Sequence, residues 1–312
     1  MSSSEDPYPS ELRELVERAF SRARERLRDG APTLATHVSR WIRSLSHDAP
    51  PERYFTHPQA FPMLLLPWWL EASITTKPDR TFQEDLVYST INGYYFVRMI
   101  DDLMDREHAA DSTVLPALIF FHMEFQSTYQ RSFPYGHPFW EAFATESFAA
   151  AEAASSDAGL DEIDRGSFVR ICAKKIAGVK VPLAAVCSRY ERPDLVGPWN
   201  RFVDAFGCWH QMQNDVLGWS RDLAHDRKTY FLSEATERRG DAPAAAWVIR
   251  DGLPWAYEQL EAWMSQVRRT ARDLGCPPLR AYVEQRNTML ATEWDGLTES
   301  LAALKQAAGA LL

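Results

Sequence analysis

Three carboxylates lie within five residues in the first half of the chain. Asp101, Asp102 and Asp105 follow an aromatic and aliphatic run that begins at Tyr94. On a helix, positions i, i+1 and i+4 bring at least two of these carboxylates onto one face, where their repulsion has to be relieved by protons, cations or water. Carboxylate oxygens at this spacing suit a hard divalent ion such as Mg²⁺, which shares its coordination sphere with substrate phosphates. The cluster therefore predicts a magnesium site that handles phosphates.

A second group of polar residues ends a long apolar segment further along the chain. Asn214, Gly218 and Asp222 are spaced by four residues, so they stack along one face of a helix. The amide oxygen and the carboxylate can hold a cation from one side, and Gly218 leaves room for a water or a phosphate oxygen. Arg221, beside Asp222, would neutralise a phosphate bound to that cation. Two such rows on apolar helices indicate two walls of one cavity with metal ions between them.

Several cationic residues are available to complete an anion site. Arg170 and Lys174 share a helix face, and Gly178 can break that helix and expose backbone carbonyls. Arg286 is a late, isolated cation. For each of them, a solvated surface charge is the competing interpretation.

The composition narrows the class of protein. The chain has 312 residues and a net charge of −9 without a basic stripe, which disfavours nucleic acid as the main partner. Eleven Trp, eleven Tyr and sixteen Phe suit a protein that lines a large apolar cavity, although a core built from aromatics has the same composition. The four cysteines, with no zinc-binding spacing among them, are Cys172, Cys187, Cys208 and Cys276.

The first ten residues are rich in Ser, Pro and acidic side chains and lack the basic and apolar regions of a signal peptide. The longest apolar run near a helix, residues 61–70, is short and interrupted by prolines, so it does not suit a membrane span. We expect a flexible tail over residues 1–10 and a soluble, cytoplasmic protein without stable membrane insertion.

Almost every long segment has helical periodicity, and no alternating strand or hairpin dipeptide is present. The pattern predicts an all-α protein with a single domain over residues 11–312, and loops at residues 76–79, 132–136, 155–159 and 275–278. The segment 163–190 is expected to break near Gly178 and Pro182. The expected helices cover residues 12–27, 32–45, 82–106, 113–129, 138–154, 163–190, 195–223, 242–274 and 279–311.

These residues resemble the class I isoprenoid (terpenoid) synthase superfamily. The run from Asp101 to Asp105 resembles its aspartate-rich DDxxD element. The run from Asn214 to Asp222 resembles the NDxxSxxxE element of microbial terpene cyclases, with Gly218 in place of the usual Ser or Thr and Asp in place of the final Glu. Arg221 falls where those cyclases carry a diphosphate-binding Lys or Arg.

The resemblance implies a helical bundle with a central active-site cavity, and a cyclase that ionises a prenyl diphosphate of C15 or C20 and releases diphosphate. It implies a three-ion Mg²⁺ cluster, with Mn²⁺ as a substitute, and it is compatible with a homodimer. Metal ligands would be Asp101, Asp105, Asn214 and Asp222, with Asp102 as a further catalytic residue; diphosphate contacts would be Arg170, Lys174, Arg221 and Arg286; Tyr94, Trp209 and Gly178 would line the cavity. The C-terminal Arg-Tyr pair of the family is replaced by Arg286 and Asn287.

Other interpretations stay open. The run from Tyr94 through Arg98 to Asp105 also looks like squalene/phytoene synthases, although these carry acidic residues where this chain has Gly218 and Arg221. A prenyltransferase that passes the prenyl group to an aromatic or second isoprenoid acceptor therefore remains an alternative. Pairs such as His225-Asp226 suggest an HD-type phosphohydrolase, which would prefer transition metals. A catalytically silent helical protein would release no diphosphate.

Overall fold

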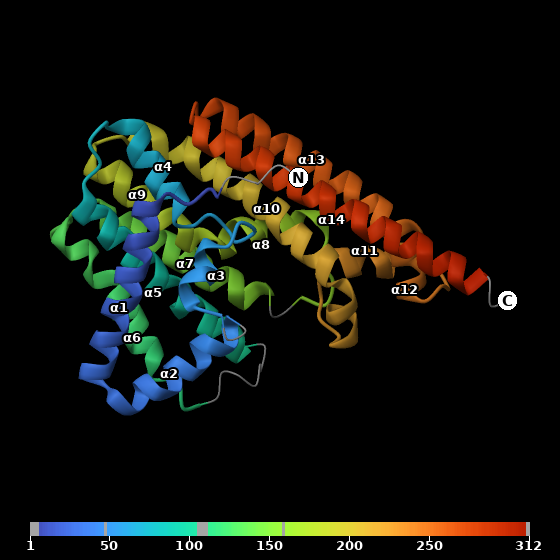
Figure 1. The fold of residues 1–312 in the computed structure, drawn as a ribbon, viewed down its shortest axis with the longest axis horizontal. Coiled ribbons are helices and arrows are strands. Elements are labelled where there is room, and N and C mark those ends of the chain that lie inside the picture. Colours follow the sequence, from blue (N-terminus) through green and yellow to red (C-terminus); the bar gives the residue numbers. More distant parts are fainter. Residues whose placement is uncertain (1–5, 47–48, 105–111, 158–159, 310–312) are drawn as a thin grey trace. The chain divides into compact units, whose positions relative to one another are not determined.

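Helices make up most of the described chain, and none of the described residues forms a β-strand (Figure 1). The structure is a computed structural model that describes residues 6–46, 49–104, 112–157 and 160–309, with side chains described as far as residue 300. The prediction of an all-α protein is confirmed. Asp105 lies outside the described residues.

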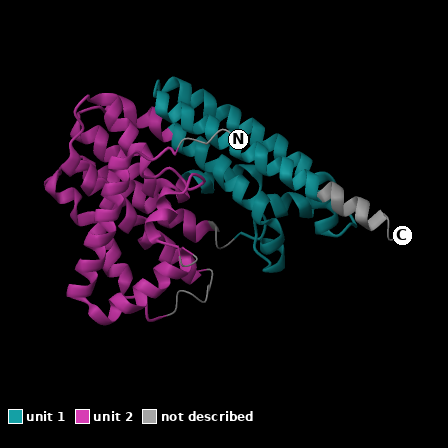
Figure 2. Cartoon of the chain, in the orientation of Figure 1, with its two compact units in different colours: residues 1–4, 159–173, 201–312 teal, residues 5–158, 174–200 magenta. Residues whose placement is uncertain are grey.

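The chain divides into two compact units, which Figure 2 shows in different colours. One, named here the α5 unit, consists of residues 5–158 and 174–200; the other, the α14 unit, consists of residues 1–4, 159–173 and 201–312. Each unit combines separate stretches of sequence, so each depends on contacts between residues far apart in the chain. The prediction of one domain over residues 11–312 stays a prediction.

The α5 unit is built around one long helix. Helix α5 packs against α6, α1 and α9, and α7 packs against α9. The Asp79 carboxylate caps α5 by accepting hydrogen bonds of 3.1 Å from the backbone N–H groups of Thr81 and Phe82. Its helices are α1 (Ser10–Gly30), α2 (Pro32–Leu45), α3 (Pro51–Thr56), α4 (Leu65–Ile74), α5 (Arg80–Met104), α6 (Ala117–Ser127), α7 (Phe139–Asp157) and α9 (Ala177–Arg189), with a 3₁₀ turn at Tyr129–Arg131.

A glycine sets the distance between α5 and α6. A Cβ atom at Gly93 would lie 2.8 Å from the Phe125 ring, which is closer than carbon atoms can approach. Beside this contact, the Ser89 hydroxyl donates a 2.6 Å hydrogen bond to the backbone carbonyl of Phe125. The close approach fixes the middle of α5 against α6, about two turns before the acidic end of α5.

In the α14 unit, α13 and α14 run beside each other and pack through apolar side chains (Figure 1). The aromatic rings of Phe168, Tyr230 and Trp263 join α8, α11 and α13, with centroid distances of 4.9–6.3 Å. The helices are α8 (Arg165–Lys175), α10 (Pro193–Ala224), α11 (Tyr230–Arg238), α12 (Ala244–Trp247), α13 (Leu253–Asp273) and α14 (Pro277–Gly309), with a π-helical turn at Val248–Gly252. The unit boundaries fall within α8 and α10.

Several predicted boundaries were wrong in detail. The segment 163–190 breaks at Ile176, two residues before Gly178, and Pro182 lies inside α9. Residues 155–157, expected in a loop, belong to α7. The segment 242–274 is interrupted by the π-helical turn, and α3, α4 and α11 were not expected. In the predicted tail, Tyr8 is buried beneath the Arg13 guanidinium. No helix among the described residues has the length and apolar character that a membrane span requires.

Candidate functional site

The burial of α5 changes near its acidic end. From Leu86 to Gly93 every side chain is buried, whereas Phe96, Val97, Arg98 and Ile100 are only half-buried. Tyr95, Met99 and Asp102 continue the buried stripe at intervals of four and three residues. The last two turns of α5 therefore keep one interior face and expose the other.

Asp102 lies on the interior face and is 1% exposed. One of its carboxylate oxygens accepts a 2.9 Å hydrogen bond from the indole N–H of Trp41 on α2, and the other lies 2.7 Å from Nε of Arg98. The Trp41 ring also packs against Tyr95 and Phe121, at centroid distances of 5.6 and 6.2 Å. The second carboxylate of the acidic cluster thus connects α2 to α5 in the interior.

Asp101, one position further round the helix, is half-buried. Its side chain projects about 100° away from that of Asp102, as consecutive residues of an α-helix do. Of the described pair, Asp102 is therefore enclosed by partners in the interior, whereas Asp101 is only partly enclosed.

The row on α10 also mixes interior and exterior residues. Asn214 is exposed, Gly218 is half-buried and Asp222 is 6% exposed. Behind the row, Gln211 donates a 2.7 Å hydrogen bond to the buried carboxylate of Asp215. The polar row therefore follows the edge of the buried face of α10.

Arg221 turns back over Gly218. Its Nε lies 3.5 Å from the Asp222 carboxylate, and a methyl group added at Gly218 would lie 3.3 Å from both Nη2 of Arg221 and Oδ2 of Asp222. The space that glycine provides is thus bordered by one cation and one carboxylate. A guanidinium can bind phosphate oxygens, and a carboxylate can bind a divalent cation.

Arg286, predicted to contact diphosphate, is 1% exposed within the α14 unit. Its guanidinium donates hydrogen bonds to Tyr282 Oη at 3.0 Å, Gln213 Oε1 at 3.2 Å and His210 Nδ1 at 3.3 Å. It also lies 5.1 Å from the centre of the Trp209 ring. Burial, followed by the Arg286 charge, lowers the pKa of His210 to about 3, so the imidazole is neutral at physiological pH. The group ties α14 to α10 directly behind Asn214.

The remaining cations and backbone features lie around the break at Ile176. On α8, Arg170 is exposed and donates a 3.0 Å hydrogen bond to the Ser167 hydroxyl, while Lys174 is half-buried. On α9, Pro182 has no N–H to donate to the carbonyl of Gly178, four residues earlier. The carbonyl of Gly178 therefore receives no hydrogen bond from the residue four positions later, although the helix break expected at Gly178 lies at Ile176.

The two predicted aromatic cavity residues differ in their surroundings. The hydroxyl of Tyr94 contacts that of Tyr54, and burial, with the Tyr54 hydroxyl next, raises the pKa of Tyr94 well above its usual value. Trp209 is 0% exposed and packs against Phe206 at 5.3 Å. Tyr94 is half-buried on α5, whereas Trp209 lies in the interior beneath Arg286.

The two rows belong to different units: Asp101 to the α5 unit, Asn214 and Asp222 to the α14 unit. Within the described residues, which leave out Asp105, no group of three or more His, Cys, Asp or Glu side chains forms a metal site. The oxygen donors that are described are those that Mg²⁺ prefers.

No family model and no curated protein matches the sequence. Among solved structures, the chain is similar to geranylgeranyl pyrophosphate synthetase from the archaeon Geoglobus acetivorans, with a TM-score of 0.64 and 13% sequence identity. The similarity covers 92% of this chain and 99% of the archaeal one. The chain has the all-helical fold of isoprenoid synthases. At this identity the likeness is one of fold, and the chemistry has to be argued from the residues.

Proposed function

We propose that the protein is a Mg²⁺-dependent terpene cyclase that ionises a prenyl diphosphate of C15 or C20. The observation that carries this proposal is the arrangement at Gly218, where Arg221 and Asp222 present a cation and a carboxylate side by side. The isoprenoid-synthase fold also supports the proposal. A further support is the half-buried Asp101 near the end of α5, where the buried face carries Asp102.

The described donors fit Mg²⁺. Asp101, Asn214 and Asp222 offer only oxygen ligands, and Asp105 is proposed with them from the sequence. When bound, the ions supply Lewis-acid charge to the diphosphate that departs. Because Asp102 is held by Trp41 and Arg98, we propose for it a positioning role in place of direct coordination.

The cations of the chain would act on the leaving group. Arg221 would hold diphosphate oxygens at Gly218, and Arg170 and Lys174 are proposed to add charge from α8. Positive charge aimed at the developing negative charge is usually the largest contribution to catalysis. The buried Arg286 would act through α10, because its guanidinium is held by Gln213, His210 and Tyr282.

The carbocation left behind needs an apolar, electron-rich surrounding. Aromatic faces stabilise a cation by roughly 0.5–2 kcal/mol per contact. We propose that Tyr94 and the carbonyl of Gly178 take part, while Trp209 supports the site from the interior. Exclusion of water then favours ring closure over quenching.

Prenyl transfer is the second candidate, because the solved structure of similar fold is named as a geranylgeranyl pyrophosphate synthetase. In that reaction the cation would add to an acceptor instead of closing on itself. The carboxylates that bind a second diphosphate in head-to-head synthases are replaced here by Gly218 and Arg221, which favours ionisation of a single substrate.

The test is incubation with geranyl, farnesyl and geranylgeranyl diphosphates plus Mg²⁺, with diphosphate release and extract mass measured together. A cyclised hydrocarbon or alcohol without an acceptor is expected. A C20, C30 or C40 chain, or turnover only with an acceptor, would replace the cyclase by a transferase. Asp101→Ala and Asn214→Ala should each abolish diphosphate release, with Asp29→Ala, an exposed carboxylate at the end of α1, as the matched control. Near-normal release by both site variants would remove the metal model.

A further inference from the structure

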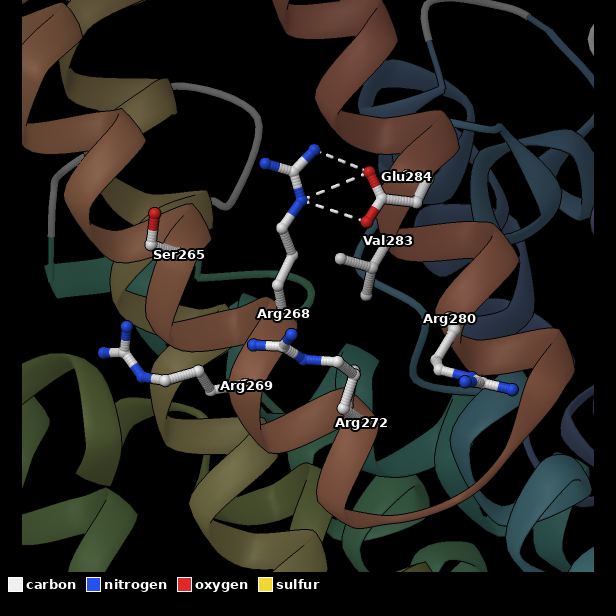
Figure 3. A pocket seen from close by; sticks show the side chains of 8 residues that line it. Ser265, Arg268, Arg269, Arg272, Arg280, Val283 and Glu284 are labelled. Atoms are coloured by element: carbon white, nitrogen blue, oxygen red, sulfur yellow. Dashed lines mark hydrogen bonds and ion pairs between the residues drawn. The ribbon is translucent and has the colours of Figure 1, made fainter.

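A pocket rich in arginine lies between α13 and α14, inside the α14 unit (Figure 3). It has a volume of about 370 Å³, and four guanidinium-bearing side chains line it together with one carboxylate. The lining residues are Ser265, Arg268, Arg269, Ala271, Arg272, Arg280, Val283 and Glu284. In a chain with a net charge of −9, this local excess of positive charge requires a separate explanation.

One arginine of the pocket is already neutralised. Arg268 forms hydrogen bonds of 2.5, 3.0 and 3.1 Å with the Glu284 carboxylate across the two helices. This bidentate pair fixes one wall, and it uses the carboxylate that lines the pocket. Asp273 follows Arg272 in the chain but does not line the pocket.

The other three arginines keep their charge available. Arg269, Arg272 and Arg280 are exposed, and neither a carboxylate nor a hydroxyl of the described residues is recorded against their guanidinium groups. Figure 3 shows Arg269 and Arg272 on α13 and Arg280 on the facing helix, with the ends of Arg269 and Arg280 pointing away from each other. The charges are therefore spread over two helices, and these exposed side chains have to turn inward to hold a single anion with several oxygens.

The position of Arg280 strengthens this reading. It lies in the first turn of α14, where the helix dipole is positive and a cation is unfavourable, and that turn contains no acidic residue. Because Pro277 and Pro278 carry no N–H, the backbone of this turn offers an anion few donors, and the positive potential here comes from the arginine side chains. An anion bound to the arginines would relieve the unfavourable placement of Arg280.

The described parts of α13 and α14 expose no large apolar side chain, and this bears on the kind of ligand that the pocket can bind. Large exposed hydrophobic residues of the described chain lie elsewhere, and neither α13 nor α14 carries one. Binding to a membrane surface combines charge with apolar insertion, so a free anion fits better. We propose that this pocket binds a compact polyphosphate group, such as inorganic diphosphate or the phosphate chain of a nucleotide.

The test is calorimetric titration of the full-length protein with inorganic diphosphate, and separately with ATP, in EDTA at low salt. Arg272→Ala/Arg280→Ala should weaken binding by about tenfold or more, and Arg201→Ala/Arg250→Ala, two exposed arginines of the same unit, should leave it unchanged. Glu284→Gln should tighten binding severalfold, because it removes the carboxylate and releases Arg268. Binding should also weaken steeply with salt.

The proposal would be overturned if the two double variants changed the affinity for diphosphate equally. It would also be overturned if Glu284→Gln, with an unchanged melting temperature, did not bind diphosphate more tightly. Vesicles containing phosphatidylserine form a further arm: arginine-dependent binding to vesicles without binding of diphosphate would assign the pocket to a lipid surface instead. Asp101→Ala should leave diphosphate binding in EDTA intact, and the arginine variants should leave prenyl diphosphate ionisation intact. The experiments therefore test the proposed pocket and the proposed active site independently, and either proposal can be wrong without the other.

Discussion

Each of the two helices that carry the acidic rows has an arginine that pairs with its polar residues, in different ways. Within α5 itself, the half-buried Arg98 pairs with the carboxylate of Asp102, which Trp41 of α2 also holds. Behind α10, Arg286 donates to the neutral groups of His210, Gln213 and Tyr282 and lies against aromatic rings. On α5, Asp102 of the acidic cluster has a structural role. Behind α10, the structural role belongs to a cation, Arg286, that the sequence had suggested as a ligand contact.

The largest effect is expected from Asp102. Asp102→Ala should lower the free energy of unfolding by about 3–5 kcal/mol, because it removes the buried carboxylate that the Arg98 guanidinium and the indole N–H of Trp41 share. Asp101→Ala, the matched control one residue away, should lower it by less than about 1 kcal/mol while abolishing diphosphate release. Urea unfolding and a diphosphate assay on both proteins measure the difference. Similar losses of stability in the two variants would contradict the proposal that Asp101 binds metal and Asp102 supports the fold.

A smaller loss is expected at Arg286. Arg286→Met keeps the length of the side chain but leaves the buried Gln213 and Tyr282 groups without this donor, so unfolding should become easier by about 2–4 kcal/mol. Because the network lies behind Asn214, the Mg²⁺ concentration for half-maximal activity should rise as well. Arg286→Lys should recover part of both losses. If the variant unfolds normally and only its binding of diphosphate is weakened, Arg286 contacts the ligand directly and is not a support.

The smallest effect is a pH dependence that distinguishes the two supports. The unfolded chain protonates His210 near the ordinary value of about 6.5, whereas the folded ring, with its pKa lowered to about 3, stays neutral. Because the unfolded state then binds more protons, stability should fall as the pH drops from 7 towards 3, by roughly 1–2 kcal/mol at pH 5. His210→Gln should lose this part of the pH dependence, measured by urea unfolding at pH 7 and 5. An unchanged slope would show that the imidazole is accessible to protons in the folded protein.

Much of the fold follows from helical periodicity, and the places where the prediction was wrong have local causes. The sequence indicated α5 and α10 because their apolar residues recur at helical spacing over many turns. It missed α4, since Pro62 and Pro67 interrupt the apolar run, although a proline is tolerated in the first turn of a helix. It also missed the π-helical turn before α13, which leaves no distinct pattern in the sequence.

The same periodicity marks two of the predicted site residues as interior. Arg286 continues the buried stripe formed by Leu279, Tyr282, Val283 and Leu290, so its spacing marked it as an interior residue. Asp102 likewise continues the stripe of Tyr95 and Met99. A polar residue on an apolar stripe can bind a ligand or stabilise the fold, and only its contacts in the structure distinguish the two roles. The contacts of Trp41, 61 residues away from Asp102, are not visible in local patterns.

The proline within α9 has a consequence of another kind. The carbonyl of Gly178, which Pro182 leaves without its helical donor, is a fixed dipole that takes up and loses no proton, so its negative end is the same in acid and in base. No substitution at position 178 removes it, because the carbonyl belongs to the backbone. The missing hydrogen bond depends on Pro182, four positions later, because a proline has no N–H group to donate to the carbonyl.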